Sequence, residues 1–146
     1  MSEMSDSLET ALINHLFRSV TFAIPTTLGF ALLTTAANDA NTGVFTAATP
    51  GVEVTNAGAY VRVNEAAGTA NWSATSGGDG QTDNIAAITF AAATANWGTV
   101  EAMAITDNIS HNSGAVLFHS AVTTSRAIDN GDTAEFAIGA ITVTLA

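Results

Sequence analysis

The spacing of apolar residues changes at Pro25, and this change constrains the fold more than any other feature of the sequence. Before Pro25, Leu8, Leu12 and Leu16 recur at four-residue steps, which is the spacing of one face of an α-helix. After it, apolar residues alternate with small or polar ones in short runs, as in strands that bury one face. Proline lacks the N–H that would continue the helix. The sequence therefore predicts an N-terminal helix followed by a mainly β domain.

We expect the helix to cover residues 6–19, with Asp6 at its N-cap and Glu9 completing a capping box. Arg18 in the last turn suits the helix dipole. Ile13, Phe17 and Val20 form a second apolar row beside the leucines.

Two apolar rows are wider than a helix needs in order to pack on one sheet. We therefore interpret residues 1–19 as an attachment segment in which one row faces the domain and the other faces a partner. The alternative is that both rows lie in a broad groove of the same domain. The candidate partner contacts on this helix are Leu8, Leu12, Leu16, Ile13 and Phe17.

The remainder, residues 20–146, is predicted to form one antiparallel β-sandwich of jelly-roll type. No helical period separates its strands, which argues against a parallel sheet. Turn-forming residues mark 107–114 and 129–132, and the stretch 68–84 contains the least regular pattern. The expected strands are 27–34, 52–55, 59–64, 85–90, 99–106, 115–122, 134–138 and 140–145.

The charge of the chain excludes several classes of partner. Thirteen acidic residues face three arginines and no lysine, giving a net charge of −10 over 146 residues. Such a chain lacks the cationic surface that nucleic acid or an anionic membrane requires. The apolar run at 20–37 is interrupted by Pro25 and Gly29, so no membrane span is expected, and the acidic N-terminus does not resemble a signal peptide.

The residues that usually carry catalysis or bind metal are not arranged for either role. There is no cysteine, the three histidines form no HxH or HxxxH pair, and no Gly-x-Ser-x-Gly elbow occurs. The acid pairs Asp79/Asp83 and Asp129/Asp132 lie in turns, where aspartate commonly bonds the backbone. We therefore expect no enzymatic activity, no cofactor and no required metal.

Two tryptophans stand in identical Thr-Ala-Asn-Trp tetrapeptides. Trp97 precedes Gly98 and is interpreted as a core anchor at a strand corner. Trp72 lies near glycines and is a candidate glycan contact, although core packing is the alternative. Arg62 and Arg126 are candidates to pair with acids across an interface between copies.

The order of motifs along nearly the whole chain resembles a family of small virion proteins of tailed phages, often labelled tail fibre proteins. The segments that carry the resemblance are His-Leu-Phe-Arg at 15–18, Pro-Thr-Thr-Leu at 25–28, Tyr-x-Arg at 60–62, Ile-Thr-Phe at 88–90, Ala-Thr-Ala-Asn-Trp-Gly-Thr-Val at 93–100, Leu-Phe at 117–118 and Asn-Gly-Asp-Thr at 130–133. The chain departs from the family at 36–54, which is longer and more polar. The resemblance implies a non-enzymatic virion protein made in the host cytoplasm.

Two roles in the virion remain open. The main interpretation is a capsid cement or decoration protein that binds the major capsid protein or other virion proteins on the outer head shell. The alternative is a tail-fibre or receptor-binding module that recognises a host surface glycan. In either role we expect a homo-oligomer, with a trimer favoured by analogy, because a surface with few charges can be buried against a copy of itself at little desolvation cost.

Overall fold

The computed structural model describes residues 3–45, 50–75 and 80–145. Within these residues it contains one helix and nine strands, so the predicted mainly β class with an N-terminal helix is confirmed. No described helix is long and apolar enough to cross a membrane. The elements in chain order are β1 (Glu3–Met4), α1 (Asp6–Arg18), β2 (Thr27–Leu33), β3 (Val63–Ala66), β4 (Gln81–Asp83), β5 (Ile88–Thr89), β6 (Gly98–Thr106), β7 (Val116–Ile128), β8 (Glu135–Phe136) and β9 (Thr142–Thr144).

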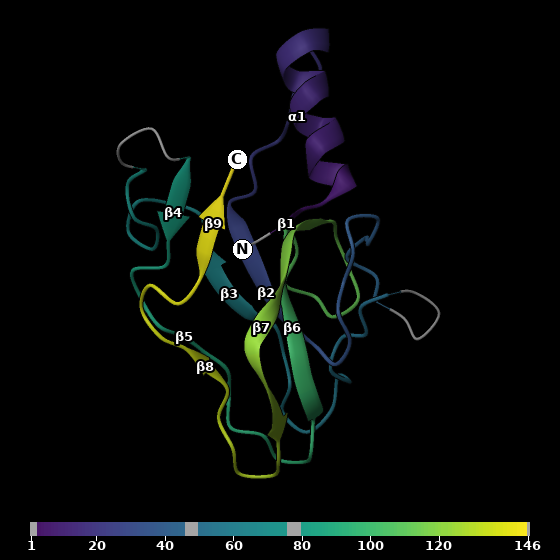
Figure 1. Ribbon diagram of the computed structural model, residues 1–146, viewed down its shortest axis with the longest axis vertical. Helices are drawn as coiled ribbons and strands as arrows, with labels where there is room; N and C mark the ends of the chain where they lie inside the picture. The colour runs from purple at the N-terminus through teal and green to yellow at the C-terminus, as the bar shows by residue number, and fades with distance from the viewer. Residues whose placement is uncertain (1–2, 46–49, 76–79, 146) are drawn as a thin grey trace.

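Five strands form the main sheet, in the order β1-β7-β6-β2-β3, and every neighbouring pair is antiparallel (Figure 1). Two further two-stranded sheets, β4-β9 and β5-β8, make a second layer. The second layer is thus two separate short pairs joined by irregular chain rather than one continuous sheet.

The main core lies between the two layers. Alternation along β2 and β6 turns Phe30, Leu32, Met103 and Ile105 to this side. The second layer contributes apolar side chains from its own strands and the segments beside them, which are Ile88, Phe90, Ile141 and Val143.

The opposite face of the main sheet holds a second, smaller core. Ala31 and Leu33 of β2 and Ala102 and Ala104 of β6 point to this side. Phe45, from the long segment between β2 and β3, covers them and is almost fully buried. Both faces of the central strands are therefore covered, which explains why β2 reads as a nearly continuous apolar run.

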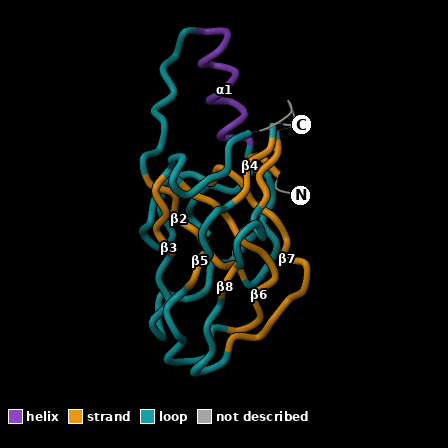
Figure 2. The backbone as a smooth tube through the Cα atoms, turned by 90° about the vertical axis from the view of Figure 1, so that its left-hand side faces the viewer, coloured by secondary structure: helices purple, strands orange, loops and turns teal. Residues whose placement is uncertain are grey.

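Helix α1 projects from one end of the sheet and the chain returns beside it to β2 (Figures 1 and 2). We call residues 6–26 the arm. Its N-cap is Ser5, whose side chain accepts a hydrogen bond from the N–H of Leu8 (3.2 Å), rather than Asp6 as the capping-box pattern predicted. Ser19 takes the left-handed conformation (φ 56°) and ends the helix, so that the N–H of Val20 bonds to the carbonyl of Asn14 (3.2 Å).

Strand β7 carries a large irregularity. On β6, Val100 pairs with Arg126 and Ala102 pairs with Ala121, so Glu101 alone separates the two pairs on β6 whereas residues 122–125 separate them on β7. The bulged strand bends away from the sheet in this region, as the outer orange trace in Figure 2 shows.

The observed strands differ from the predicted ones in length and in position. The predicted 59–64 strand overlaps β3 only at residues 63 and 64, and the short strands β1 and β4 were not predicted. The segment 52–55 contributes an isolated bridge between Leu33 and Glu53 instead of a strand. β5 and β8 keep two residues each, whereas β7 runs six residues past the predicted end. The glycine-rich 68–84 stretch ends in β4, which pairs with β9, and its 76–80 run lies, apart from Gly80, outside the described residues, together with the predicted turn residue Asp79.

Candidate functional site

The arm carries five exposed large apolar side chains, four of them in the second half of the helix or just after it. Phe17 and Ile24 are 80% and 79% exposed, and Leu16 is 71% exposed. Leu8 is buried and Leu12 half-buried at the base of the same helix, where both pack on the main core. We call the exposed group in and just after the second half of the helix the arm tip, and it consists of Ile13, Leu16, Phe17 and Val20. Ile24 is also exposed, on the segment that returns to β2.

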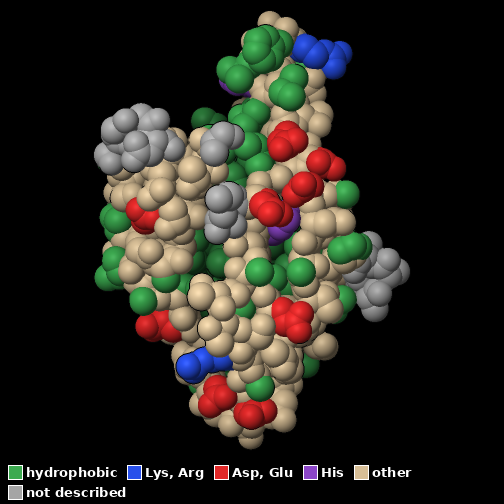
Figure 3. All heavy atoms as spheres, viewed as in Figure 1, with side chains coloured by type: hydrophobic (Ala, Val, Ile, Leu, Met, Phe, Trp, Pro, Cys, Tyr) green, Lys and Arg blue, Asp and Glu red, His purple; other side chains and the backbone are tan. Residues whose placement is uncertain are grey.

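Charge is distributed unevenly between the arm and the rest of the molecule. No acidic residue occurs from 10 to 38, and Arg18 is the only arginine in that stretch. The Arg18 guanidinium donates to Oδ1 of Asn14 (3.0 Å), which holds it beside the tip. Acidic side chains gather at the base of the arm, seen in red below the helix in Figure 3. The arm tip is thus apolar with one positive charge beside it, whereas Asp6 and Glu9 lie at the base of the arm and the other eleven acids lie outside it.

A pocket of about 370 Å³, which we call the apolar pocket, lies between the main sheet and the second layer. Trp72 forms part of its wall, and its indole stacks on Phe30 with ring centroids 6.1 Å apart. Nε1 of Trp72 is buried and has no hydrogen-bond acceptor among the described residues. The other walls include Leu28, Ile105, Leu117, Phe118 and Val143, with Ala67, Gly68 and Thr69 on the β3–β4 connection.

A second, larger hollow of about 710 Å³, the β7 cleft, lies along the bulged strand. The hydroxyls of Thr123 and Thr124 and the guanidinium side chain of Arg126 line it from β7, and Glu135 and Phe136 line it from β8. Unlike the apolar pocket, the β7 cleft offers several hydrogen-bond donors and acceptors beside apolar surface.

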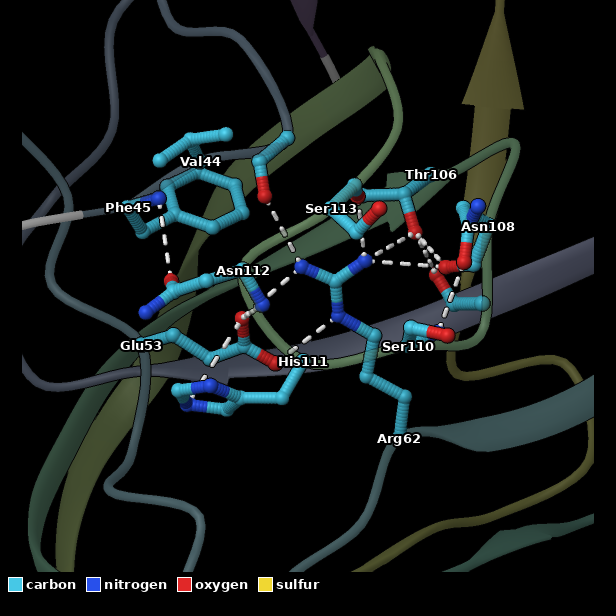
Figure 4. Close-up of polar contacts among 12 residues, drawn as sticks. Val44, Phe45, Glu53, Arg62, Thr106, Asn108, Ser110, His111, Asn112 and Ser113 are labelled. Atoms are coloured by element: carbon cyan, nitrogen blue, oxygen red, sulfur yellow. Dashed lines mark hydrogen bonds and ion pairs between the residues drawn. The ribbon is translucent and has the colours of Figure 1, made fainter.

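Arg62 lies at the centre of a buried polar network (Figure 4). Its guanidinium makes a bidentate pair with Glu53, through Nε to Oε1 and Nη2 to Oε2, both 2.8 Å, and neither side chain is exposed. The remaining donors bond the carbonyls of Gly43 (3.0 Å), Asn108 (2.8 Å) and Ser113 (2.8 Å). A single side chain therefore satisfies backbone groups of two separate loops.

Tyr60 extends this network into the main core. Its hydroxyl donates to Oε1 of Glu53 (3.0 Å) and accepts from the N–H of Leu32 (2.9 Å). Burial raises the pKa of Tyr60 far above its ordinary value, and the charge of Glu53 raises it further. His111 donates from Nε2 to the carbonyl of Val54 (2.9 Å) at the edge of the same network.

The three histidines lie apart. Among the described residues, one group of possible metal ligands, Glu3, Asp39 and His119, has its ligand atoms within 4.8 Å of one another. Nε2 of His119 lies 3.0 Å from Asp39, and Nδ1 lies 4.0 Å from Glu3. Because each ring nitrogen faces its own carboxylate, this histidine connects β1 and the 34–44 loop to β7.

The sequence-predicted residues divide into surface and interior positions. The arm residues Ile13, Leu16 and Phe17 are exposed, and Arg126 is exposed in the β7 cleft. Arg62 lies inside the domain, because its own Glu53 supplies the acid that was expected from another copy. Asp132 accepts from the N–H of Asp129 (3.0 Å), as the turn interpretation predicts.

The two tryptophans also separate. Trp97 is buried in the main core, and its Nε1 donates to the carbonyl of Gly58 (2.8 Å). Trp72 is half-buried against Phe30 rather than standing free on the surface. Sequence reasoning missed Glu53, the apolar pocket and the β7 cleft. The only available signal for the pair of Glu53 and Arg62 was the two-residue alternation that places Arg62 on the same face as Tyr60.

Comparison with models of protein families identifies the family to which the chain belongs. The family model described as "Podophage GP4 fiber I protein gp80" matches residues 3–144. A comparison with curated protein sequences gives no significant match. The matched region includes the arm, the main sheet and the second layer, which is nearly the entire chain. The chain therefore belongs to the podophage GP4 fiber I protein gp80 family, a family of phage tail fibre proteins.

Proposed function

We propose that this chain is a non-enzymatic structural subunit of a phage tail fibre, and that the arm tip attaches it within the virion. The observation that carries the proposal is the exposure of five large apolar side chains on a projecting arm that carries no acidic residue beyond Glu9. Contiguous apolar patches of this kind mark interaction sites. Family membership favours the tail-fibre role over the capsid cement role.

The energetics support attachment by the arm tip. Fully burying one large aliphatic or aromatic side chain is favourable by roughly 1.5–3 kcal/mol. The arm tip offers several such side chains, and Leu8 and Leu12 fix its base to the domain. The second apolar row therefore meets a partner in this proposal, whereas the base of the first row packs on the same chain.

The proposal is tested by changing the arm tip in a phage that depends on this gene. The double variant Leu16→Ser/Phe17→Ser is expected to fold normally but to be missing from purified particles. Ile138→Ser is the matched control, because Ile138 is 68% exposed and lies outside the arm. Normal amounts of the double variant in particles would show that the arm tip is not the attachment element.

A second candidate function, recognition of a host surface glycan, is favoured by the β7 cleft. Saccharides are bound by hydroxyl and charged groups placed beside aromatic surface. Thr124, Arg126 and Phe136 supply these groups in the cleft, whereas the walls of the apolar pocket beside Trp72 are mainly apolar. Isolated host surface polysaccharide is expected to bind wild type and to bind Arg126→Ala at least tenfold more weakly. Equal binding by the two proteins, or none, would remove this candidate.

A further inference from the structure

The arm tip has the shape of a knob. Its helical residues Ile13, Leu16 and Phe17 occupy only the last two turns of α1, and the same helix face nearer the base carries Asp6 and Glu9. A coiled coil needs a seam of three or four heptads. The tip is therefore suited to insertion into a concave apolar site rather than to lying along another helix.

The apolar pocket provides such a site on the same chain. Its volume of about 370 Å³ is at the lower end for binding pockets and matches a few large side chains. Leu28, Ile105 and Phe118 present apolar surface to it from the main sheet, and Trp72 presents an indole from the β3–β4 connection. Inserting an apolar side chain here removes apolar surface of both partners from water.

The tip of the same molecule does not occupy this pocket. Phe17 is 80% exposed, and Leu28, at the start of β2, is on the sheet near the base of the arm. The 13-residue helix is about 20 Å long and points away from the sheet (Figures 1 and 2). The tip and the pocket of one chain are thus held apart, so a tip that enters the pocket comes from another copy.

Charge near the pocket complements charge on the tip. Glu65 on β3 pairs directly with Leu28, so its side chain lies on the same face of the sheet as the pocket. Glu65 has no ion-pair partner among the described residues. Arg18 is adjacent to Phe17, and it is free of acidic partners in the described part of its own chain. Insertion of Phe17 brings the only charge of the tip toward an unpaired carboxylate.

We infer that copies of this chain associate by inserting the arm tip of one copy, led by Phe17, into the apolar pocket of a second copy. The inference rests on the proposed function, since it names what the attachment arm binds. Each copy gives one arm and receives another, an arrangement that closes in a pair or, where the rotation between copies closes, in a ring such as the proposed trimer. Arg18 then pairs with Glu65 of the second copy at the rim.

The cysteine-free chain allows a direct test by disulfide formation. Leu16→Cys places a thiol on the tip while keeping Phe17, and Thr69→Cys places one at the exposed wall of the pocket. An equimolar mixture of the two single variants is expected to form a crosslink between the two different chains under mild oxidation. Each variant alone is expected to stay uncrosslinked. Self-crosslinking of Leu16→Cys would show that tips meet each other, and absence of the mixed crosslink would overturn the inference.

A variant that fills the apolar pocket is the matched control for the crosslinking experiment. A Cβ added at Gly68 meets no atom within 4 Å, so a side chain can start there without a clash, and Gly68→Phe is chosen to add bulk at the pocket wall. Combined with Thr69→Cys, it is expected to reduce the mixed crosslink at least tenfold, and an unchanged yield would contradict insertion. If Leu16→Ser/Phe17→Ser is lost from particles but the crosslink does not form, the proposed function stands and the inference fails. If the crosslink forms but particles incorporate that double variant, the inference stands and the proposed function fails.

Discussion

At the scale of single residues, two tryptophans in identical tetrapeptides have opposite hydrogen-bonding states. The Nε1 donor of Trp97 bonds to Gly58, whereas the Nε1 donor of Trp72 is buried without an acceptor among the described residues. An unmade bond of a buried donor is destabilising, and replacing the donor by an apolar group removes that penalty. The local sequence cannot reveal this difference, because the acceptor for Trp97 comes from a residue 39 positions away.

Replacing each tryptophan by phenylalanine measures how much this difference in hydrogen bonding contributes to the free energy of unfolding. We expect Trp97→Phe to be more destabilising than Trp72→Phe by about 1–2 kcal/mol, since only the first loses a hydrogen bond. The two changes delete the same ring, so each serves as the steric control for the other. The measurement is the free energy of unfolding in denaturant, and equal losses would show that the hydrogen bond of Trp97 contributes nothing.

Tyr60 predicts a loss of stability in alkaline solution. The folded chain keeps its phenol protonated because burial raises the pKa, while the unfolded chain releases the proton near about pH 10. Above that pH the unfolded state binds fewer protons, so stability falls as pH rises, by at most about 1.4 kcal/mol per pH unit.

The composition of the chain allows the titration of Tyr60 to be measured without overlap from other side chains. The chain contains one tyrosine, no lysine and no cysteine, so between about pH 9 and 12 Tyr60 is the side chain that titrates. Thermal melts across this range are expected to show the decline in wild type. Tyr60→Phe, although less stable at neutral pH, is expected to show a flat profile, and an equal decline in both proteins would exclude Tyr60 as the cause.

At the scale of elements, Arg62 and Glu53 connect loops that the strands alone leave independent. Segment 34–54 and the 107–114 turn both present backbone carbonyls to one guanidinium. Removing Arg62 leaves Glu53 buried without its bidentate partner, which costs about 3–5 kcal/mol for a buried pair.

We therefore expect Arg62→Ala to lower the free energy of unfolding by about 3–5 kcal/mol. Arg62→Lys is expected to recover only part of this, because an ammonium cannot reproduce the planar fork of donors. Arg126→Ala is the control, since Arg126 is exposed and such substitutions change stability by about 0.5 kcal/mol or less. Comparable losses for Arg62→Ala and Arg126→Ala would contradict a stabilising network.

Sequence periodicity predicts the elements well where one chain segment determines its own burial. The helix, β2 and β6 agree with prediction within about one residue at each end, because each has a strong apolar period. The two-residue strands and the bulge in β7 depend on pairing with distant segments, so their lengths cannot be obtained from local pattern. For the candidate site, the apolar rows indicate an exposed surface, but the apolar pocket is formed by residues from Leu28 to Val143 and is invisible in any short window.

At the scale of the whole molecule, a net charge of −10 opposes contact between copies. The acid-free arm tip places the apolar contact at the end of the molecule with the least negative charge. Added salt shortens the range of repulsion between the acidic bodies, from about 30 Å at 0.01 M to about 10 Å at 0.1 M.

Association between copies is thus expected to strengthen as sodium chloride is raised from about 0.01 M to 0.2 M, because screening reduces body repulsion more than it weakens one Arg18–Glu65 pair. Sedimentation equilibrium at several salt concentrations measures this directly. Leu16→Ser/Phe17→Ser is expected to stay monomeric at every concentration of salt. Association that weakens with salt would show that opposite charges, rather than the apolar tip, hold the copies together.

The arm is anchored in the main sheet at both of its ends, and this has a mechanical consequence. Ser5 bonds to Val116 and Leu117 at the start of β7, and Thr27 begins β2. The arm runs roughly along the strands (Figure 1). A pulling force on the tip therefore loads β2 in shear along its length, so that its hydrogen bonds to β3 and β6 resist together instead of rupturing one after another. A fibre subunit held by this arm would resist drag along that axis better than tension applied across the sheet.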